Sequence, residues 1–215
     1  MSPHAPPHVL RDWITRHLDP LDQDQPVEGR IAADIGVKPV WPVDTGAPPK
    51  HAAVLIGLIA RDEGVSVLLT RRSDNLRSHT GQVAFPGGRR DPGESAWQTA
   101  LREAHEEVGL DPSFVSLVGL STPYWSGSNY LITPVVGFIR EGFSLTPNPD
   151  EVADIFETPF GFLMNPDNHQ IHERQSPDGE LRRFYAMTHE DRYIWGVTAG
   201  VLRELYDRLY GAAFA

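Results

Sequence analysis

The chain has 215 residues, a length that suits one domain with an additional arm. Hydrophobic residues make up 40% of it and charged residues 22%, which excludes wholesale disorder. It contains no cysteine, so disulfide frameworks, thiolate zinc sites and cysteine nucleophiles are excluded. The net charge of -10 argues against nucleic acid as a partner, and any anionic ligand therefore requires local positive charge or a metal ion.

We expect no secretory signal in the N-terminal residues. Residues 1–10 contain three prolines and two histidines but no apolar run of the kind found in secretory signals. The strongest apolar run, 52–60, is well short of the roughly 20 residues that a membrane helix needs. We therefore expect a cytoplasmic protein without a membrane partner.

The first fifty residues are expected to differ from the rest of the chain. Apolar residues at helical spacing predict a short amphipathic helix over 9–18. Prolines recur from 19 to 50, which favours an extended arm. We predict that residues 1–50 form a helix and a proline-rich arm packing on a domain that spans 51–215. The arm is also a candidate contact between two copies in a homodimer.

Strand and helix patterns alternate in the remaining sequence. Runs at 52–59 and 65–70 predict a hairpin, because the polar turn 61–64 ends in a glycine that suits a positive φ. The mixture of strands and helices favours an α/β sandwich. The later predictions are strands at 114–120 and 131–139 around a loop at 123–130, a loop at 147–150, mixed signals at 152–164, an exposed loop at 165–180, a strand at 184–187, and a closing helix at 193–210 with Trp195 and Leu202 on its core face.

The best-marked helix covers 96–108. Ser95 and Gln98 form the Ser-x-x-Gln pattern of a capping box, and Gly109 stands where a helix ends in a left-handed residue. At 100° per residue, Glu103, Glu106 and Glu107 fall within an arc of about 100°, while the apolar residues share the other side.

Three carboxylates on one helix face admit two interpretations. A solvated acidic face is the commoner case. Glu106 and Glu107, however, have only Arg102 as a nearby helical cation, and like charges at this spacing oppose helix formation. Converging oxygen ligands are what Mg²⁺ or Mn²⁺ requires, so we favour a metal site on this face.

The same residues resemble a known family. Gly88, Glu94 and the segment from Arg102 to Leu110, REAHEEVGL, match the signature of the Nudix hydrolases at each specified position. The preceding segment 68–88, LLTRRSDNLRSHTGQVAFPGG, resembles the second signature that marks the coenzyme A pyrophosphatase branch. The resemblance implies a Nudix-type α/β/α sandwich with a mixed β-sheet.

The resemblance also implies an activity and roles for the acidic residues. It implies a Mg²⁺- or Mn²⁺-dependent hydrolase that splits the diphosphate of coenzyme A into 4′-phosphopantetheine and adenosine 3′,5′-bisphosphate. Glu103 and Glu107 are the expected principal metal ligands, and Glu106 either binds the metal or orients the water. The general base is Glu103, Glu106 or Glu151, in falling order of expectation.

The glycines and the remaining signature residues have implied roles as well. The resemblance suggests the Gly87 carbonyl as a further metal ligand, while Gly87 and Gly88 can equally serve only a tight turn. Glu94 and Arg102 are expected to pair and hold the loop against the helix.

An arginine-rich stretch precedes the acidic helix. Residues 68–90 carry a local net charge of +4 in an acidic chain, which suits a ligand with several phosphates. We expect Arg71 and Arg77, with Arg89, to bind phosphate, against the alternative that they only keep the loop soluble. His79 either binds phosphate or holds the loop.

The substrate remains open at this stage. Tyr124, Trp125 and Tyr130 form either a wall for adenine or the pantetheine arm, or part of the core. Other Nudix substrates are alternatives, namely ADP-ribose, NADH or a nucleotide sugar. A non-catalytic nucleotide sensor is the alternative from a different functional class.

Overall fold

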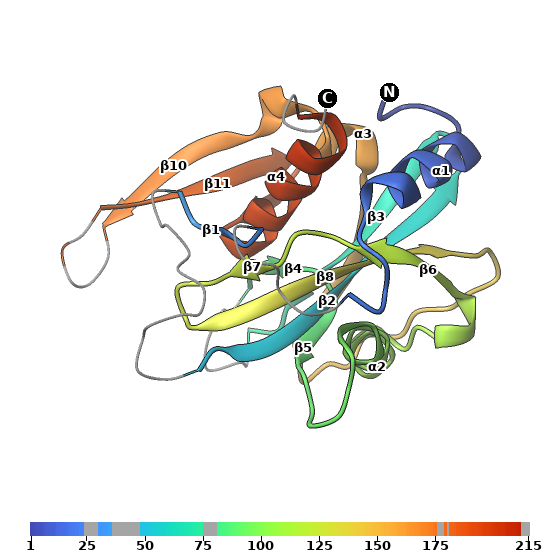
Figure 1. The fold of residues 1–215 in the computed structure, drawn as a ribbon, viewed down its shortest axis with the longest axis horizontal. Helices are drawn as coiled ribbons and strands as arrows, with labels where there is room; N and C mark the ends of the chain where they lie inside the picture. Colours follow the sequence, from blue (N-terminus) through green and yellow to red (C-terminus); the bar gives the residue numbers. More distant parts are fainter. Residues whose placement is uncertain (24–29, 36–47, 75–80, 176–178, 180, 212–215) are drawn as a thin grey trace.

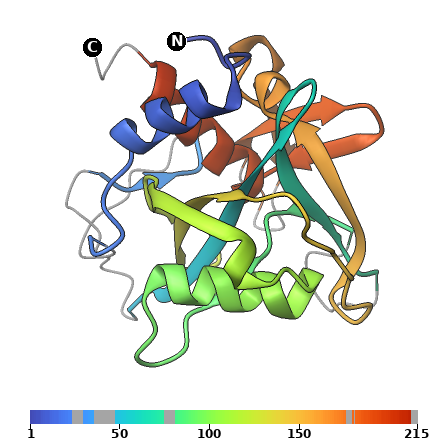
Figure 2. The same cartoon turned by 90° about the vertical axis from the view of Figure 1, so that its right-hand side faces the viewer.

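A mixed β-sheet lies between two helical layers (Figures 1 and 2). The computed structural model describes residues 1–23, 30–35, 48–74, 81–175, 179 and 181–211. In chain order the elements are α1 (Pro7–His17), β1 (Ala32–Ala33), β2 (Lys50–Arg61), β3 (Gly64–Arg72), β4 (Val83–Ala84), β5 (Gly87–Arg89), α2 (Ala96–Val108), β6 (Val115–Leu120), β7 (Tyr124–Trp125), β8 (Tyr130–Ile139), β9 (Val152–Pro159), α3 (Phe160–Leu163), β10 (Gln170–Gln175), β11 (Leu181–His189), β12 (Arg192–Trp195) and α4 (Val197–Tyr210). Two 3₁₀ turns, Pro112–Phe114 and Pro166–Asn168, complete the set.

The sheet is mixed because β2 and β8 run parallel while most other neighbours are antiparallel. Its main order is β1-β7-β8-β2-β3-β4, and β9 pairs with β3. One edge of β2 is shared: β3 pairs with its 58–61 end and β5 pairs with its 52–54 end. The chain therefore leaves β2 along β3 and returns to it at β5, which opens the sheet between these two strands.

Each face of the sheet has its own helical cover. Alternation along β2 sends Ala53 and Leu55 to the face of α2, which packs with its apolar stripe. The stripe consists of Ala96, Ala100, Ala104 and Val108. The opposite face is covered by α1, α3 and α4, so the expected α/β/α sandwich is confirmed (Figure 2).

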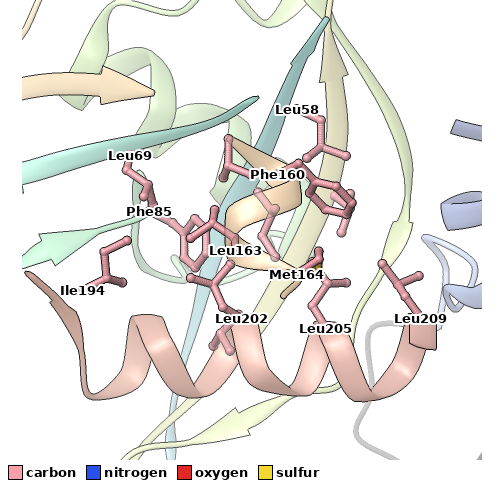
Figure 3. Close-up of a cluster of buried hydrophobic side chains, with 14 of the residues drawn as sticks. Leu58, Leu69, Phe85, Phe160, Leu163, Met164, Ile194, Leu202, Leu205 and Leu209 are labelled. Carbon is pink, nitrogen blue, oxygen red and sulfur yellow. The ribbon is translucent and has the colours of Figure 1, made fainter. Parts of the chain in front are cut away.

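The α4 layer contains the larger apolar core. Leu202, Leu205 and Leu209 line one side of α4 and meet Phe160 and Leu163 of α3 (Figure 3). Phe85, which directly precedes the Pro86–Gly87 segment, is 4% exposed in this core. The core therefore fixes the start of the glycine segment that leads to α2.

Most local predictions are confirmed. The hairpin forms with Arg61 opposite Gly64, and Gly64 has φ +130°. Helix α2 has the predicted bounds, the capping box at Ser95 and a left-handed Gly109 at φ 67°. The first helix covers Pro7–His17 rather than 9–18.

Three predictions were wrong. The expected loop at 165–180 contains β10, and the loop at 123–130 contains β7. The expected helix over 193–210 begins only at Val197, because β12 precedes it and Gly196 turns the chain with φ 63°. Trp195 therefore lies on a strand and not on the core face of a helix, whereas Leu202 is in the core as expected.

The N-terminal helix is tied to the last one. Arg208 of α4 is 5% exposed, donates from Nη1 to Asp19 Oδ2 at 2.9 Å and also donates from Nε to the His17 carbonyl. Burial alone would raise the pKa of Asp19, but the hydrogen bond and charge of Arg208 hold it below its ordinary value. The division of the chain at residue 50 stays a prediction. No helix in the described ranges combines the length and apolarity needed to cross a membrane.

We expect Arg208→Met to lower the free energy of unfolding by about 2 kcal/mol, because it removes the buried cation of the Asp19 carboxylate and leaves the more exposed Arg30 at 3.5 Å. Urea denaturation measures this. The control is Arg61→Met, which breaks a more exposed pair with Glu157 and should cost less than about 1 kcal/mol. Equal losses in both variants would contradict a special role for the buried pair.

Candidate active site

The glycine segment and helix α2 meet at very short range. The Gly87 N–H donates to Glu107 Oε2 at 3.1 Å. A β-carbon on Gly88 would lie 2.5 Å from Glu103 Cδ, and one on Gly87 would lie 2.5 Å from the Ala53 carbonyl oxygen. Neither glycine has a positive φ, so close approach, and not turn geometry, is the reason for glycine here.

The three carboxylates of α2 differ in exposure. Glu107 is 4% exposed, the Glu103 side chain is 14% exposed, and the Glu106 side chain is 52% exposed. Burial, reinforced by the charges of Glu103 and Glu151, raises the pKa of Glu107 to about 7 against the opposing hydrogen bond from Gly87. Burial likewise raises the pKa of Glu103. The helix thus carries two desolvated carboxylates close to each other.

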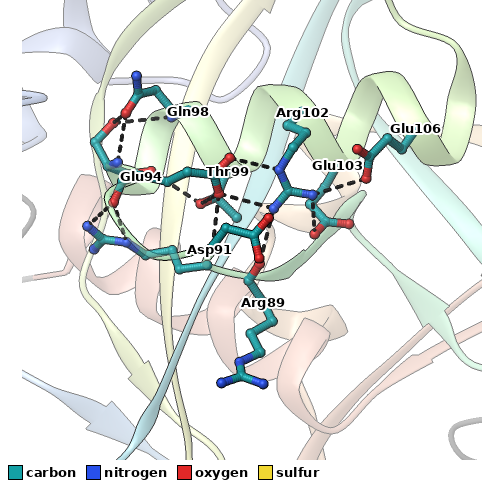
Figure 4. Close-up of polar contacts among 10 residues, drawn as sticks. Arg89, Asp91, Glu94, Gln98, Thr99, Arg102, Glu103 and Glu106 are labelled. Atoms are coloured by element: carbon teal, nitrogen blue, oxygen red, sulfur yellow. Dashed lines mark hydrogen bonds and ion pairs between the residues drawn. The ribbon is translucent and has the colours of Figure 1, made fainter.

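A network around Arg102 holds the loop before α2 (Figure 4). Arg102 donates from Nε to Glu94 Oε1 at 2.8 Å and from Nη2 to Glu94 Oε2 at 3.1 Å. Its Nη2 also donates to the Arg89 carbonyl at 3.1 Å, and Thr99 Oγ1 donates to Glu94 Oε2 at 2.7 Å. The expected pairing of Glu94 with Arg102 is therefore present.

The remaining guanidinium nitrogen of Arg102, Nη1, contacts the acidic face of α2. Nη1 donates to Glu103 Oε1 at 2.9 Å and to Glu106 Oε2 at 3.0 Å. Within the described residues no three acidic or histidine side chains gather closely enough to hold a metal ion. That all three glutamates meet at one metal ion stays a prediction.

The residues nevertheless fit a hard divalent cation. Glu107 is buried next to Glu103. Glu103 accepts a hydrogen bond from Arg102, and Glu107 accepts one from the Gly87 N–H. All donors are oxygen atoms, which Mg²⁺ and Mn²⁺ prefer. A cation would offset both the desolvation and the mutual repulsion of these two carboxylates.

The loop before β9 brings Glu151 to the same place. The Asn148 N–H donates to the Glu107 carbonyl at 2.9 Å, and the Ser73 N–H donates to the Glu151 carbonyl at 2.8 Å. The loop is thus fastened both to the end of α2 and to the end of β3. The charge of Glu151 contributes to the raised pKa of Glu107 and of Glu103, so its carboxylate belongs to this cluster.

The structure describes two of the three arginines that are expected to bind phosphate, Arg71 and Arg89. Arg71 Nη1 pairs with Asp74 at 3.2 Å. The Arg89 side chain is exposed and points away from the carboxylates (Figure 4), so the structure does not place it at the cluster. Arg77 and His79 lie outside the described residues.

Arg72 is the residue that the sequence interpretation passed over. Its Nε is buried without a hydrogen-bond partner, and its charge acts on Glu107, where it lowers the pKa. In a strand alternate residues face opposite ways, and the β3–β9 register shifts between Arg71 and Arg72. The alternation of side chains along β3 would have identified Arg72 if the register of β3 against β9 had been known.

Of the three aromatic residues Tyr124, Trp125 and Tyr130, the structure assigns Tyr124 to the core. Tyr124 is 2% exposed, and its hydroxyl donates to Asp34 Oδ1 at 2.7 Å. A β-carbon on Gly200 of α4 would lie 2.4 Å from the same hydroxyl oxygen, so the ring fills the space beside α4. Tyr124 is therefore a packing residue and forms no open wall.

Comparison with known proteins fixes the family. Residues 49–181 match the NUDIX domain. The chain belongs to the Nudix hydrolase family. It is 42% identical over 172 residues to a Nudix hydrolase NudL of Yersinia enterocolitica, described as uncharacterized, covering 78% of this chain and 86% of that protein. A NudL of Photorhabdus laumondii, with the same description, is 43% identical over 161 residues, covering 74% and 85%.

Among solved structures, the chain is similar to an Ap4A hydrolase of C. elegans, at 20% identity and a TM-score of 0.44, covering 49% of this chain and 77% of that one. Membership of the Nudix hydrolase family makes the chain a pyrophosphohydrolase of nucleoside diphosphate derivatives, an activity for which this family generally uses divalent metal ions.

The Glu94–Arg102 pair predicts a pH dependence of stability. The hydrogen bond from Arg102 lowers the pKa of Glu94 from 4.5 to about 2. Because the folded pKa is depressed, the pair stabilises the fold fully above about pH 5, and this contribution is lost as the pH falls toward 2. Urea midpoints measured from pH 7 to pH 2.5 should therefore fall less steeply in Glu94→Gln than in the wild type.

The control for this series is Glu63→Gln, which changes an exposed residue of the β2–β3 turn and should follow the wild-type curve. Parallel curves for Glu94→Gln and the wild type would show that the pair does not contribute.

Proposed function

We propose that this Nudix hydrolase splits the diphosphate of coenzyme A or one of its derivatives, with Mg²⁺ or Mn²⁺, into 4′-phosphopantetheine and adenosine 3′,5′-bisphosphate. The observation that carries the proposal is the environment of the buried Glu107, which accepts a hydrogen bond from the Gly87 N–H and lies near the charge of Arg72. Residues of the two neighbouring signature segments therefore meet at Glu107. ADP-ribose, NADH and nucleotide sugars are the alternative substrates.

In this proposal the carboxylates hold the cation and the arginines receive the phosphates. Glu103 and Glu107 hold the metal, with Glu106 and the Gly87 carbonyl as further ligands. When bound, the cation neutralises the diphosphate and polarises the phosphorus under attack. Water then forms a bond to that phosphorus as the bridging P–O bond breaks, and a carboxylate of Glu103, Glu106 or Glu151 accepts the proton of the water.

The surrounding contacts support this division of work. Glu94 fixes Arg102, and through Nη1 Arg102 sets the directions of Glu103 and Glu106. Backbone hydrogen bonds fasten the loop of Glu151 to the end of α2 and to the residue after β3, so the backbone of Glu151 is held beside the helix. Catalysis by positioning requires this kind of rigid frame.

The substrate test separates coenzyme A from the alternatives. Purified protein with Mg²⁺ is incubated separately with coenzyme A, NADH and ADP-ribose, and the products are resolved by chromatography. We expect coenzyme A to be turned over with the highest kcat/KM. The control Glu107→Gln should lower kcat roughly 10²–10³-fold while the melting temperature is kept, since the ligand charge is lost. Equal turnover of the three compounds would defeat the assignment of substrate.

Arg72 has its own prediction. We propose that its guanidinium binds a substrate phosphate next to Glu107, together with Arg71 and Arg77, and that His79 is a further candidate for binding phosphate. Arg72→Lys should raise KM roughly tenfold, because a lysine cannot reproduce the forked donors of arginine. The control Arg61→Lys changes a pair at the far hairpin and should leave KM unchanged. An unchanged KM in Arg72→Lys would remove Arg72 from the phosphate site.

A further inference from the structure

The start of helix α4 is fastened to the strand that leads to the glycine segment. Thr198, the second residue of α4, donates from its hydroxyl to the Val83 carbonyl of β4 at 2.9 Å. Both residues are buried, since Thr198 is 7% exposed and Val83 is 5% exposed. A helix that covers the opposite face of the sheet from α2 is thus connected by one side chain to the segment that meets Glu107.

The Val83 carbonyl requires a donor from outside the sheet. Strand β4 is two residues long and ends the main strand order. The Arg72 N–H donates to the Gln82 carbonyl at 2.9 Å, and these residues continue the register that pairs Arg71 with Val83. Opposite residues of antiparallel strands alternate between bonding each other and facing away, so the Val83 carbonyl points away from β3. Thr198 therefore satisfies a buried acceptor on the outer side of β4.

The chain after Val83 is held on both sides of Phe85. Before it, the Thr70 hydroxyl of β3 donates to the Ala84 carbonyl at 3.2 Å. Phe85 itself points into the core on the side of α4 (Figure 3). After it, the Leu55 N–H of β2 donates to the Pro86 carbonyl at 2.8 Å. The segment thus crosses from the edge of β3 to the edge of β2 between fixed points, and Thr198 supplies the one that belongs to α4.

The glycine segment has little room to move without disturbing the carboxylates. The Gly87 N–H donates to Glu107 Oε2 at 3.1 Å. A β-carbon on Gly87 would lie 2.7 Å from Val54 Cα, and one on Gly88 would lie 2.5 Å from Glu103 Cδ. A small shift of the segment therefore changes its distances to both carboxylates.

We propose that Thr198 is a positioning residue: its hydroxyl fixes Val83, and through the chain that follows it sets the place of the Gly87 N–H and carbonyl against Glu107. The consequence for metal binding rests on the proposed metal ligands, but it does not depend on which diphosphate is cleaved. Groups that orient metal ligands typically change metal affinity roughly 10–100-fold when they are removed. Thr198 acts through the backbone, so we expect the lower end of this range.

The test compares two substitutions of Thr198 that differ in the hydroxyl. Thr198→Val keeps the shape of the side chain and removes the donor, whereas Thr198→Ser keeps the donor and removes the methyl group. The matched control is Thr158→Val in β9. Thr158 is also buried, at 0% exposed, and its hydroxyl has no hydrogen-bond partner among the described residues. Melting temperatures report whether each variant is folded.

The first measurement is hydrogen exchange of the backbone amides, followed by NMR without metal or substrate. We expect Thr198→Val to speed exchange of the Gly87 amide about tenfold, because its bond to Glu107 opens more often, while amides within α2 and β8 keep their rates. Thr198→Ser and Thr158→Val should leave the Gly87 rate close to that of the wild type.

The second measurement is Mn²⁺ binding to the substrate-free protein, followed by the electron paramagnetic resonance signal of free Mn²⁺. Thr198→Val should raise the Kd for Mn²⁺ about tenfold, and Thr198→Ser should restore it. Turnover is measured with whichever of coenzyme A, NADH and ADP-ribose the wild type cleaves fastest. The loss of kcat/KM in Thr198→Val should be about tenfold at limiting Mg²⁺ and should shrink at saturating Mg²⁺, which a loss of stability alone would not produce.

A folded Thr198→Val variant with wild-type Gly87 exchange and wild-type Mn²⁺ affinity would overturn the inference. An equal defect in Thr198→Ser would do the same, because the hydroxyl would then not be the active group. If Thr198→Val does not fold, Thr198→Ala replaces it, since alanine removes the hydroxyl without placing a methyl group against the Val83 oxygen. Loss of the fold in both variants would show a role in stability alone and overturn the inference.

The two measurements also separate this inference from the proposed function. A wild-type protein that binds no Mn²⁺ would refute the metal site of the proposed function. Faster exchange at Gly87 in Thr198→Val would then still support the positioning by Thr198, and unchanged exchange would overturn it.

Discussion

The close approach of helix α2 to the Gly87–Gly88 backbone is the constraint on which the rest of the site depends. It places Glu107 under the Gly87 N–H and leaves no room for a β-carbon between Gly88 and Glu103. Taking these carboxylates out of water is unfavourable, as the raised pKa of Glu107 shows. The helix tolerates this because both its ends are capped and its apolar stripe is fully packed. Local capping and core packing together therefore hold two carboxylates in an unfavourable but chemically useful place.

The topology of the sheet explains why distant segments meet here. Strand β3 leaves β2 after the hairpin, carries Arg71 and Arg72 outward, and pairs there with β4 and β9. The chain then returns through Phe85 to β5, which takes the free edge of β2. The opening between β3 and β5 lies beside the end of α2 and is bordered by the Glu151 loop. A continuous pairing of β3 along β2 would leave no such opening.

The sequence predicted those features that depend on local chemistry. The bounds of α2, its caps, the β2–β3 hairpin and the Glu94–Arg102 pair all follow from residues near one another in the chain. Strand β10 was missed because an edge strand exposed on both faces has no apolar alternation, and its sequence QIHERQ resembles a loop. Arg72 was passed over for a related reason. Which of two adjacent arginines faces the carboxylates depends on a register shift against β9, a partner about eighty residues later.

The charge balance around α2 explains why a divalent cation suits this site better than another arginine. Arg102 is committed to Glu94 through Nε and Nη2, so only Nη1 is directed at Glu103 and Glu106. Arg72 acts on Glu107 from the other side. Glu103 and Glu106 thus share one guanidinium, that of Arg102, while the charge of Arg72 acts on Glu107 and the charge of Glu151 adds to the negative side. A guanidinium carries one charge and needs space for its planar group, whereas a small divalent ion brings two charges into the narrow space beside Gly87 and Gly88. The excess of negative charge is therefore a property that the fold maintains, and in the proposed function a divalent ion would offset it before a diphosphate approaches.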